Sequence, residues 1–350
     1  MIFSKKLITW YLQNKRSMPW RETNNPYPIW LSEIILQQTK VAQGLPYYMS
    51  FIEAFPTVFD LAKASEEEVL KLWQGLGYYS RARNLHVTAK HVADNLNGVF
   101  PVTYKDLLLL KGVGDYTASA IASICYKEAV PVVDGNVYRV LSRYFNIETP
   151  INSAIGVKQF KALAIQLMDH DDPADYNQAI MEFGALQCRP KKPDCFICPL
   201  CDSCEALKKG NVERLPVKLK KIKVKKRYFN YLIFYTKNHQ TIISQRIGNG
   251  IWQGLYEFPL IESDTINKDT IVDHPVFKQV VENDEYEIVP YYSEPVVHKL
   301  SHQHLYTRFY VIKIDGLIKT NETQKKINTK DIRKYPVPIL LSNFIDVFFK

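Results

Sequence analysis

The chain has 350 residues, enough for two domains that each bury a sizeable core. Hydrophobic residues make up 46% of it, and no apolar run approaches the ~18 residues of a membrane helix, which excludes a membrane-spanning protein. The first residues lack the apolar core of a signal peptide, so we expect a cytoplasmic protein.

Most of the formal net charge of +9 comes from one stretch. Residues 208–227 contain ten Lys or Arg residues and a single Glu, whereas the rest of the chain is close to neutral. A basic stretch of this kind suits a polyanion such as nucleic acid. A solvated linker, or an edge strand protected by lysines, explains it almost equally well.

The first stretch that could carry catalytic residues is 30–39, for which the apolar spacing predicts a helix. Its buried face would carry Leu31, Ile34, Ile35 and Ala42. On the other side, Glu33 is expected to share a surface with Trp30 and Gln37, three and four residues away. A carboxyl beside apolar neighbours can have a raised pKa and act as a general acid, although a helical Glu is most often simply solvated.

Helical patterns dominate up to about residue 205, and strand patterns follow the basic stretch. Ser65, followed three residues later by Glu68, predicts a helix start with a capping box. Residues 75–83 predict the start of another helix. The stretches 228–235 and 296–312 are rich in β-branched and aromatic residues, which predicts strands in a second, mixed α/β domain.

Residues 110–118 contain two glycines, Gly112 and Gly114, between two helical patterns. The glycines allow a tight turn and a close approach to a partner, and the following helix directs free N–H groups outward, which suits a phosphate. This helix–hairpin–helix pattern predicts that Gly112, Val113 and Gly114 anchor a DNA backbone regardless of base sequence. An ordinary glycine-rich turn is the alternative.

The helix predicted after residue 134 begins with Asp134 or Asn136. The simplest role of Asp134 is an N-cap, which is worth about 1 kcal/mol. In a functional role, the helix dipole and the backbone N–H groups would keep the carboxylate ionised, so that it could stabilise a cationic sugar. Together with Glu33 it would complete the pair of carboxyl groups used in glycosidic bond cleavage.

Five cysteines lie within residues 188–204. Four of them follow the spacing C-x6-C-x2-C-x5-C, namely Cys188, Cys195, Cys198 and Cys204. A disulfide scaffold is not expected in a cytoplasmic chain of this length, so the cluster predicts an iron–sulfur or zinc site. The spacing alone leaves a second ligand set open, because Cys201 also fits a regular ladder with the last three.

Five motifs occur in the order found in the MutY family of adenine DNA glycosylases, within the endonuclease III superfamily. They are residues 30–39, 75–79, 112–114, 133–137 and 188–204. The chain resembles this family over nearly all of residues 5–205, and more loosely in the C-terminal domain.

The resemblance implies a mainly α helix–hairpin–helix glycosylase region, residues 1–205, followed by an α+β MutT-like (Nudix-like) domain. The helical region would comprise a six-helix domain, residues 25–133, and an iron–sulfur domain formed by residues 1–24 and 134–205. A basic linker, residues 206–227, would join it to the lesion-recognition domain, residues 228–350.

The resemblance also implies a function. The enzyme would remove adenine mispaired with 8-oxoguanine or guanine from double-stranded DNA, in base excision repair. Glu33 would protonate adenine and later activate water, and Asp134 would stabilise the sugar cation, with Tyr116 and Asn136 as further catalytic residues. Relatives that also cut the strand carry a nucleophilic Lys where this chain has Tyr116, so we expect base removal without efficient strand cleavage.

Cofactor and assembly follow from the same resemblance. A 4Fe–4S cluster would be bound through Cys188, Cys195, Cys198 and Cys204, which leaves Cys201 spare. We expect a monomer that associates with the nucleoid and not with a membrane.

The expected substrate-binding residues fall into two groups. Trp20, Arg21 and Glu182 would line the adenine pocket. The second group would fill the space left by the flipped base and probe the opposite base: Gln37, Gln38, Thr39, Leu76 and Tyr78. For Tyr78, a position in the hydrophobic core is the alternative.

The C-terminal domain lacks the Arg-Glu and Glu-Glu pairs of the Nudix hydrolase signature, so pyrophosphatase activity with Mg²⁺ is not expected. In relatives a Phe-Ser-His loop reads 8-oxoguanine. Here the corresponding residues are Leu300, Ser301 and His302. Ser301 and His302 are expected to hydrogen-bond the lesion, whereas the aromatic contact is lost.

Two other functions compete with this interpretation. A thymine or uracil mismatch glycosylase is one, because some of those relatives also have Tyr at the hairpin position. Gln37, Gln38 and the long C-terminal domain argue against it. A catalytically silent DNA-binding protein is the other, and the presence of both carboxylates argues against that.

Overall fold

The computed structural model describes residues 2–219, 224–266, 268–281, 285–316 and 318–349. It contains two compact units: unit 1 is Met1–Lys63 with Asn84–Lys220, and unit 2 is Ala64–Arg83 with Lys221–Lys350. The segment 64–83 thus groups with the C-terminal part of the chain, which differs from the division expected at 206–227. Residues 220–223 of the expected linker lie outside the described residues.

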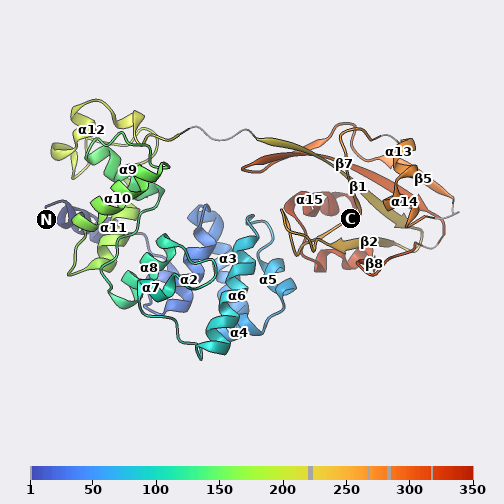
Figure 1. The fold of residues 1–350 in the computed structure, drawn as a ribbon, viewed down its shortest axis with the longest axis horizontal. Coiled ribbons are helices and arrows are strands. Elements are labelled where there is room, and N and C mark those ends of the chain that lie inside the picture. Colours follow the sequence, from blue (N-terminus) through green and yellow to red (C-terminus); the bar gives the residue numbers. More distant parts are fainter. Residues whose placement is uncertain (1, 220–223, 267, 282–284, 317, 350) are drawn as a thin grey trace. The chain divides into compact units, whose positions relative to one another are not determined.

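Unit 1 is helical, as Figure 1 shows. Its first helices are α1 (Ile2–Asn14), α2 (Pro26–Leu36), α3 (Val41–Ala54) and α4 (Val58–Lys63). After α6 (Ser80–Asn95), whose residues fall in both units, come α7 (Tyr104–Leu107), α8 (Asp115–Tyr126), α9 (Gly135–Tyr144), α10 (Ala154–Leu167), α11 (Pro173–Leu186) and α12 (Glu205–Lys208). None of the helices among the described residues has the length and apolar character needed to cross a membrane.

Helix α11 lies at the centre of the packing in unit 1, because it contacts α1, α8 and α9. Helix α2 packs against α3 and α8 in turn. The buried part of α8 consists mostly of small residues, Thr117 to Ile124, which allows neighbouring helices to approach closely. The two helices expected to carry the carboxyl groups, α2 and α9, are therefore linked through the contact between α8 and α11.

The helix that carries Glu33 is shorter than predicted. Helix α2 ends at Leu36, and Ala42 lies in α3, because the chain turns at Gln38 with a φ of 56°. The position predicted for Trp30 is also wrong. Its side chain is fully buried, with its ring 5.3 Å from that of Phe100, so it belongs to the core and not to a surface shared with Glu33.

Two helix starts are confirmed. Helix α5 (Glu66–Leu72) begins with the predicted capping box, in which the Ser65 hydroxyl accepts from the Glu68 N–H and the Glu68 carboxylate accepts from the Ser65 N–H. Helix α6 begins at Ser80, within the stretch predicted to open a helix.

Unit 2 contains two sheets (Figure 1), which confirms the α+β prediction. In the five-stranded sheet, β1 (Lys225–Thr236) lies parallel to β7 (Gln303–Ile314). Three strands pair antiparallel with these two, β4 (Leu260–Glu262), β5 (Tyr286–Pro290) and β6 (Val296–Lys299). The second sheet has the order β3 (Tyr256–Glu257), β2 (Gln240–Gln245), β8 (Gln324–Asn328).

The apolar middle of β1 is buried over residues 229–234, as a central strand with both faces covered requires. Besides α5 and the first residues of α6, the described part of the unit contains α13 (Lys268–Asp273), α14 (Pro275–Lys278) and α15 (Ile339–Phe348). On α15, the ring of Phe344 stacks on Phe309 of β7, with 4.3 Å between ring centroids.

Residues 64–83 contact the C-terminal part of unit 2 through polar groups. The Tyr256 hydroxyl donates to Glu67 at 2.9 Å, and Arg83 donates to the backbone carbonyl of Gln253 at 2.7 Å. These contacts place the segment against the sheet of β2, β3 and β8.

Candidate active site

Glu33 and Asp134 line one pocket of unit 1, with a volume of about 580 Å³. The end of α2, the hairpin before α8 and the start of α9 form its wall. Its lining residues are Glu33, Leu36, Gln37, Gln38, Gly112, Gly114, Asp115, Tyr116, Thr117, Asp134 and Gly135. The structure therefore brings both expected catalytic carboxyl groups, the hairpin glycines, Tyr116 and the Gln37–Gln38 pair to one cavity.

Glu33 is half-buried in this pocket and closely surrounded by protein. Burial raises the pKa of its carboxyl from 4.5 to about 7. A hydrogen bond from Tyr116 and the charge of Arg21 act in the opposite direction, whereas the charge of Asp134 raises the pKa further. The expected rise is thus confirmed, and Glu33 holds a proton in a large fraction of molecules near neutral pH.

Asp134 is the N-cap of α9. Its Oδ1 accepts from the backbone N–H groups of Asn136 and Val137 at 2.9 and 2.8 Å, and its Oδ2 accepts from the Asn136 amide at 2.8 Å. The sequence led us to expect a carboxylate kept ionised by these groups. Burial acts against these groups and raises the pKa of Asp134 above its ordinary value.

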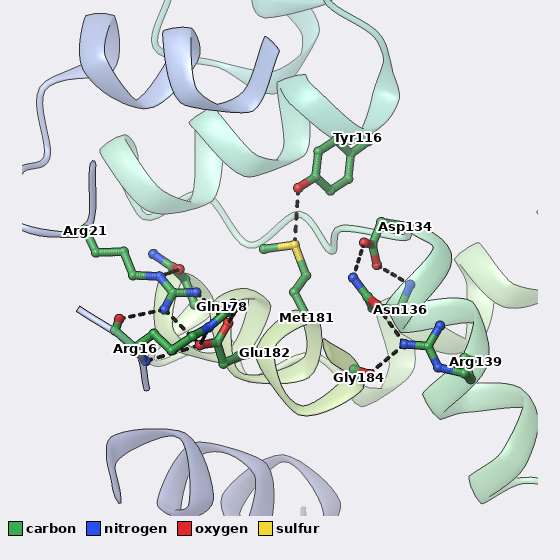
Figure 2. A network of polar contacts seen from close by, with 10 residues as sticks. All are labelled: Arg16, Arg21, Tyr116, Asp134, Asn136, Arg139, Gln178, Met181, Glu182 and Gly184. Carbon is green, nitrogen blue, oxygen red and sulfur yellow. Dashed lines mark hydrogen bonds and ion pairs between the residues drawn. The ribbon is translucent and has the colours of Figure 1, made fainter. Parts of the chain in front are cut away.

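The side chain of Asn136 is itself held by Arg139, as Figure 2 shows. Arg139 donates to the side-chain amide oxygen of Asn136 at 2.7 Å. It also donates to the backbone carbonyls of Gly184 and Cys188, at 2.6 and 2.8 Å. A Cβ on Gly184 would lie 2.7 Å from the Asn136 Cβ. Only glycine therefore lets α11 approach α9 closely enough for this network.

Tyr116 lies in the first turn of α8. Burial raises the pKa of its phenol well above the ordinary value of 10, and the charges of Glu33 and Asp134 raise it further. Its hydroxyl therefore keeps its proton, and it donates to the Met181 Sδ at 3.3 Å (Figure 2). No amine is present at this position.

Glu182 has its carboxylate oxygens occupied by two arginines. Arg16 donates to both oxygens at 2.7 Å, and Arg21 donates to them at 3.2 and 3.0 Å (Figure 2). Burial would raise the pKa of Glu182, but the hydrogen bonds from Arg16 and Arg21 lower it to about 2. Trp20, expected beside them in the adenine pocket, is buried and packs its ring against Tyr48.

Sequence reasoning missed Arg16, Met181 and Gln178, which accepts from Arg21 at 2.9 Å. None of them belongs to a recognisable motif. Their contacts join residues more than sixty positions apart, so no local pattern could have indicated them.

The hairpin has the geometry that its glycines predicted. Gly112 has a φ of 78°, and a Cβ there would lie 2.7 Å from the Asn84 Cβ, so glycine is required. Gly114 is the N-cap of α8, and Val113 is buried, which leaves its backbone as the part that a partner could contact. Beside the hairpin, Lys161 forms an ion pair with Asp115 at 3.0 Å that the sequence did not indicate.

The remaining expected substrate-binding residues of unit 1 lie at the end of α2. The Gln37 amide donates to the Thr117 hydroxyl at 3.1 Å, and the Thr39 hydroxyl donates to the Gln37 backbone carbonyl at 3.3 Å. Thr39 does not line the pocket, unlike Gln37 and Gln38.

In unit 2, Tyr78 is 54% exposed, with a φ of 48°, which rules out the hydrophobic core as its position. Its hydroxyl lies 2.5 Å from the Ser301 hydroxyl. Both line a pocket of about 360 Å³ together with Trp252, Leu300 and His302. Leu76 is buried at 6% exposure, so it is not presented to a partner as expected.

Residues of the segment 188–204 and the buried Arg143 line one hollow. Five cysteines line it, Cys188, Cys195, Cys198, Cys201 and Cys204. Arg143 donates to the backbone carbonyls of Arg189 and Leu215 at 2.7 and 3.1 Å, and it lies 3.5 Å from the Cys188 sulfur.

Four of these thiols influence one another. Burial raises the pKa of Cys198 to about 12, and the charges of Cys188, Cys195 and Cys204 add to the rise. The Cys201 thiol contacts the Asp202 carboxylate. Among the described residues, no three Cys, His, Asp or Glu side chains converge closely enough to hold a single metal ion.

Comparisons with known proteins agree with this geometry. Residues 31–160 match the HhH-GPD superfamily of base excision DNA repair proteins, and residues 230–347 match a NUDIX domain. The helical part resembles the solved structure of a thermostable thymine-DNA glycosylase, with a TM-score of 0.55 and 30% identity over 59% of this chain and 96% of that one.

Two relatives cover different shares of the chain. An adenine DNA glycosylase of Buchnera aphidicola subsp. Acyrthosiphon pisum (strain APS) is 31% identical over 98% of this chain and 97% of its own length. The human adenine DNA glycosylase is 46% identical over 61% of this chain, and the chain spans only 41% of that protein. The resemblance drawn from the sequence motifs is thus confirmed, and the chain belongs to the adenine DNA glycosylase family.

Proposed function

We propose that the protein hydrolyses the N-glycosidic bond of adenine in double-stranded DNA, where adenine lies opposite 8-oxoguanine or guanine, as a monomeric enzyme of base excision repair. The observation that carries the proposal is the pocket lined by Glu33, Asp134 and the hairpin glycines, in a chain of the adenine DNA glycosylase family. Two carboxyl groups with raised pKa values beside a phosphate-binding turn suit glycosidic cleavage.

Glu33 acts as the general acid. An adenine anion is a poor leaving group, and protonation of the ring at N7 lets the base leave as a neutral molecule. General acid catalysis contributes about 10²–10⁴-fold to such a step. The pKa of about 7 supports this role, because the proton is both present and transferable near neutral pH. After the base departs, the Glu33 carboxylate accepts a proton from the attacking water.

Asp134 faces the developing sugar cation. Its pKa is raised in the free protein, and a positive charge at the sugar favours the ionised form and thereby stabilises the oxocarbenium-like state. Asn136, fixed by Arg139, holds the carboxylate in one orientation. Tyr116 offers no amine for a Schiff base, which supports base removal without strand cleavage.

The target base must leave the stack to reach this pocket, at a cost of a few kcal/mol. Gln37 and Gln38 fill the vacated space. Trp20, Arg21 and Glu182 do not line this pocket, but the charge of Arg21 acts on Glu33, which supports a place for them beside the base. Because arginines occupy the oxygens of Glu182, a base that binds Glu182 must displace one of them.

Tyr78, Ser301 and His302 read the base opposite adenine. The hydroxyl pair of Tyr78 and Ser301 supports this role, because hydroxyls and imidazole can match the extra N7–H donor and O8 acceptor of 8-oxoguanine. Leu300 supplies no aromatic face, so discrimination depends on these hydrogen bonds.

Cys188, Cys195, Cys198 and Cys204 bind a 4Fe–4S cluster. These four cysteines line one hollow, which supports a shared ligand. When bound, the cluster would cross-link the segment 188–204. Replacing Cys198 by Ser should abolish the brown absorption, whereas Cys201→Ser should retain it; loss of colour in the Cys201 variant would overturn the ligand set.

The deciding experiment is base release from duplexes that vary the target base and its opposite. We expect adenine release opposite 8-oxoguanine and guanine, without a strand break. Ser301→Ala and His302→Ala should reduce the preference for 8-oxoguanine over guanine. Release of thymine or uracil opposite guanine, with adenine untouched, would instead establish the competing mismatch activity, and binding without any base release would establish a silent DNA-binding protein.

A further inference from the structure

Met181 lies on the face of α11 that meets α8. Its thioether sulfur accepts from the Tyr116 hydroxyl at 3.3 Å, and Figure 2 shows the side chain directed from α11 toward Tyr116. The residue is half-buried, and the proposed chemistry gives it no role. Simple packing would explain an apolar side chain here, but it does not explain a sulfur aimed at the Tyr116 hydroxyl.

The position of Met181 is fixed because α11 is anchored on either side of it. Before it, the Asn177 side chain accepts from the Val132 N–H at 3.1 Å and donates to the Val130 carbonyl at 2.9 Å. After it, Glu182 is bound by two arginines, and the Gly184 carbonyl accepts from Arg139. The helix can therefore present the sulfur at one place in the active site.

The Tyr116 hydroxyl has one proton and two acceptors within reach, the Met181 sulfur and the Glu33 carboxyl. An ionised Glu33 is the stronger acceptor, because a charge-assisted hydrogen bond exceeds one to a thioether. A protonated Glu33 is a weaker acceptor, and the hydroxyl then turns to sulfur. Met181 thus supplies a partner for Tyr116 in the state in which Glu33 is ready to donate.

We propose that Met181 is a positioning residue of the active site, which competes with Glu33 for the Tyr116 hydroxyl and thereby keeps the catalytic proton on Glu33. The proposal rests on the role of Glu33 as the general acid. It assigns to α11 a second contribution to catalysis, beside the side chain of Glu182.

Other groups that act on Glu33 remain in place when Met181 is changed. They are the charges of Asp134 on α9 and Arg21 of the short helix 19–21, the Tyr116 hydroxyl, and the Cys125 thiol on α8, whose own pKa Glu33 raises. Met181→Leu removes the acceptor while keeping a similar volume. Met181→Gln restores an acceptor, an amide oxygen, on a chain of similar length.

The test is the pH dependence of adenine release under single-turnover conditions with saturating enzyme, on a duplex with adenine opposite 8-oxoguanine. Without the sulfur, the Tyr116 hydroxyl donates to Glu33 instead, which stabilises the ionised form of Glu33 relative to the protonated form. In Met181→Leu the midpoint above which the rate falls should therefore move down by about half a pH unit, since a hydrogen bond is worth about 1 kcal/mol and one pH unit about 1.4. That shift makes release about threefold slower above the midpoint.

The controls separate this effect from packing. Met181→Gln should have a midpoint at or above that of the unsubstituted protein, and Met168→Leu, the same change at another buried methionine, should not move it. In a Tyr116→Phe background, which lacks the donor, Met181→Leu should cause no further shift.

Two results would overturn the proposal alone: an unmoved midpoint in Met181→Leu, or an equal shift in the Tyr116→Phe background. A Glu33→Gln variant as fast as the unsubstituted protein, or a protein that releases no adenine, would overturn the proposed function and this inference with it.

Discussion

Two glutamates in unit 1, the half-buried Glu33 and the buried Glu182, behave in opposite ways. Burial raises the pKa of Glu33 to about 7. Burial also acts to raise the pKa of Glu182, but direct hydrogen bonds from Arg16 and Arg21 bring it to about 2. Arg21 affects both carboxyl groups, Glu33 by its charge alone and Glu182 by contact. Of these two carboxyls, only the one without a direct arginine partner can therefore keep a proton near neutral pH.

The largest effect expected from this comparison is the loss of the acid. Glu33→Gln should lower adenine release by about 10²–10⁴-fold, because the amide cannot protonate the base. Single-turnover release from a duplex with adenine opposite 8-oxoguanine measures the loss. Binding of the same duplex serves as the control and should persist. Near-normal release would remove Glu33 from its role.

A substitution of Glu182 tests the carboxylate that is paired with two arginines. Glu182→Gln leaves two guanidinium groups without their carboxylate, and breaking a buried ion pair in this way costs about 3–5 kcal/mol of stability. Urea unfolding followed by helical circular dichroism measures it. The matched variant Glu33→Gln should cost little stability, because it removes a buried carboxyl that has no direct arginine partner. Equal losses in the two variants would contradict the comparison.

The pH dependence of the rate sharpens the comparison further. A carboxyl with a pKa of about 7 is protonated below that pH and loses its proton above it. Adenine release should therefore fall by about tenfold for each pH unit above 7. Glu182 has a pKa of about 2 and is therefore ionised from pH 4 to 9, so it should add no inflection to the rate profile in that range. A rate that rises above pH 7 would exclude Glu33 as the acid.

The smallest effect concerns the two arginines. The Arg16 side chain is 37% exposed, against 15% for Arg21, so solvent screens its ion pair with Glu182 more strongly. Arg16→Ala should cost about 1 kcal/mol of stability, since Arg21 continues to neutralise the carboxylate. The same urea titration measures it. A loss as large as that of Glu182→Gln would show that Arg16 holds the pair alone.

The parts of the molecule that follow from local rules could be predicted from the sequence. The capping box of Ser65 and Glu68, the N-cap at Asp134 and the positive φ of Gly112 each depend on a few neighbouring residues. The helical and α+β domain types follow from hydrophobic periodicity in the same way.

The rest depends on contacts between distant segments. Trp30 was expected beside Glu33, but its position is decided by Phe100, seventy residues away. The direction of the pKa shift of Asp134 could not be predicted, because helix geometry is visible in a sequence and the depth of burial is not. Arg16 belongs to no motif, and it enters the site only because Glu182 lies opposite it in the fold.

The ion pair of Lys161 and Asp115 has a consequence for DNA binding under the proposed function. Lys161 also donates to the Pro131 carbonyl, and the Tyr104 hydroxyl donates to Asp115, so the acidic side chain beside the hairpin is fully compensated. A phosphate at Gly112–Gly114 would then meet the backbone amides and the exposed Lys111, without an uncompensated carboxylate beside them. The salt dependence of DNA affinity would accordingly originate in Lys111 and in cations elsewhere, such as those of the stretch 208–227.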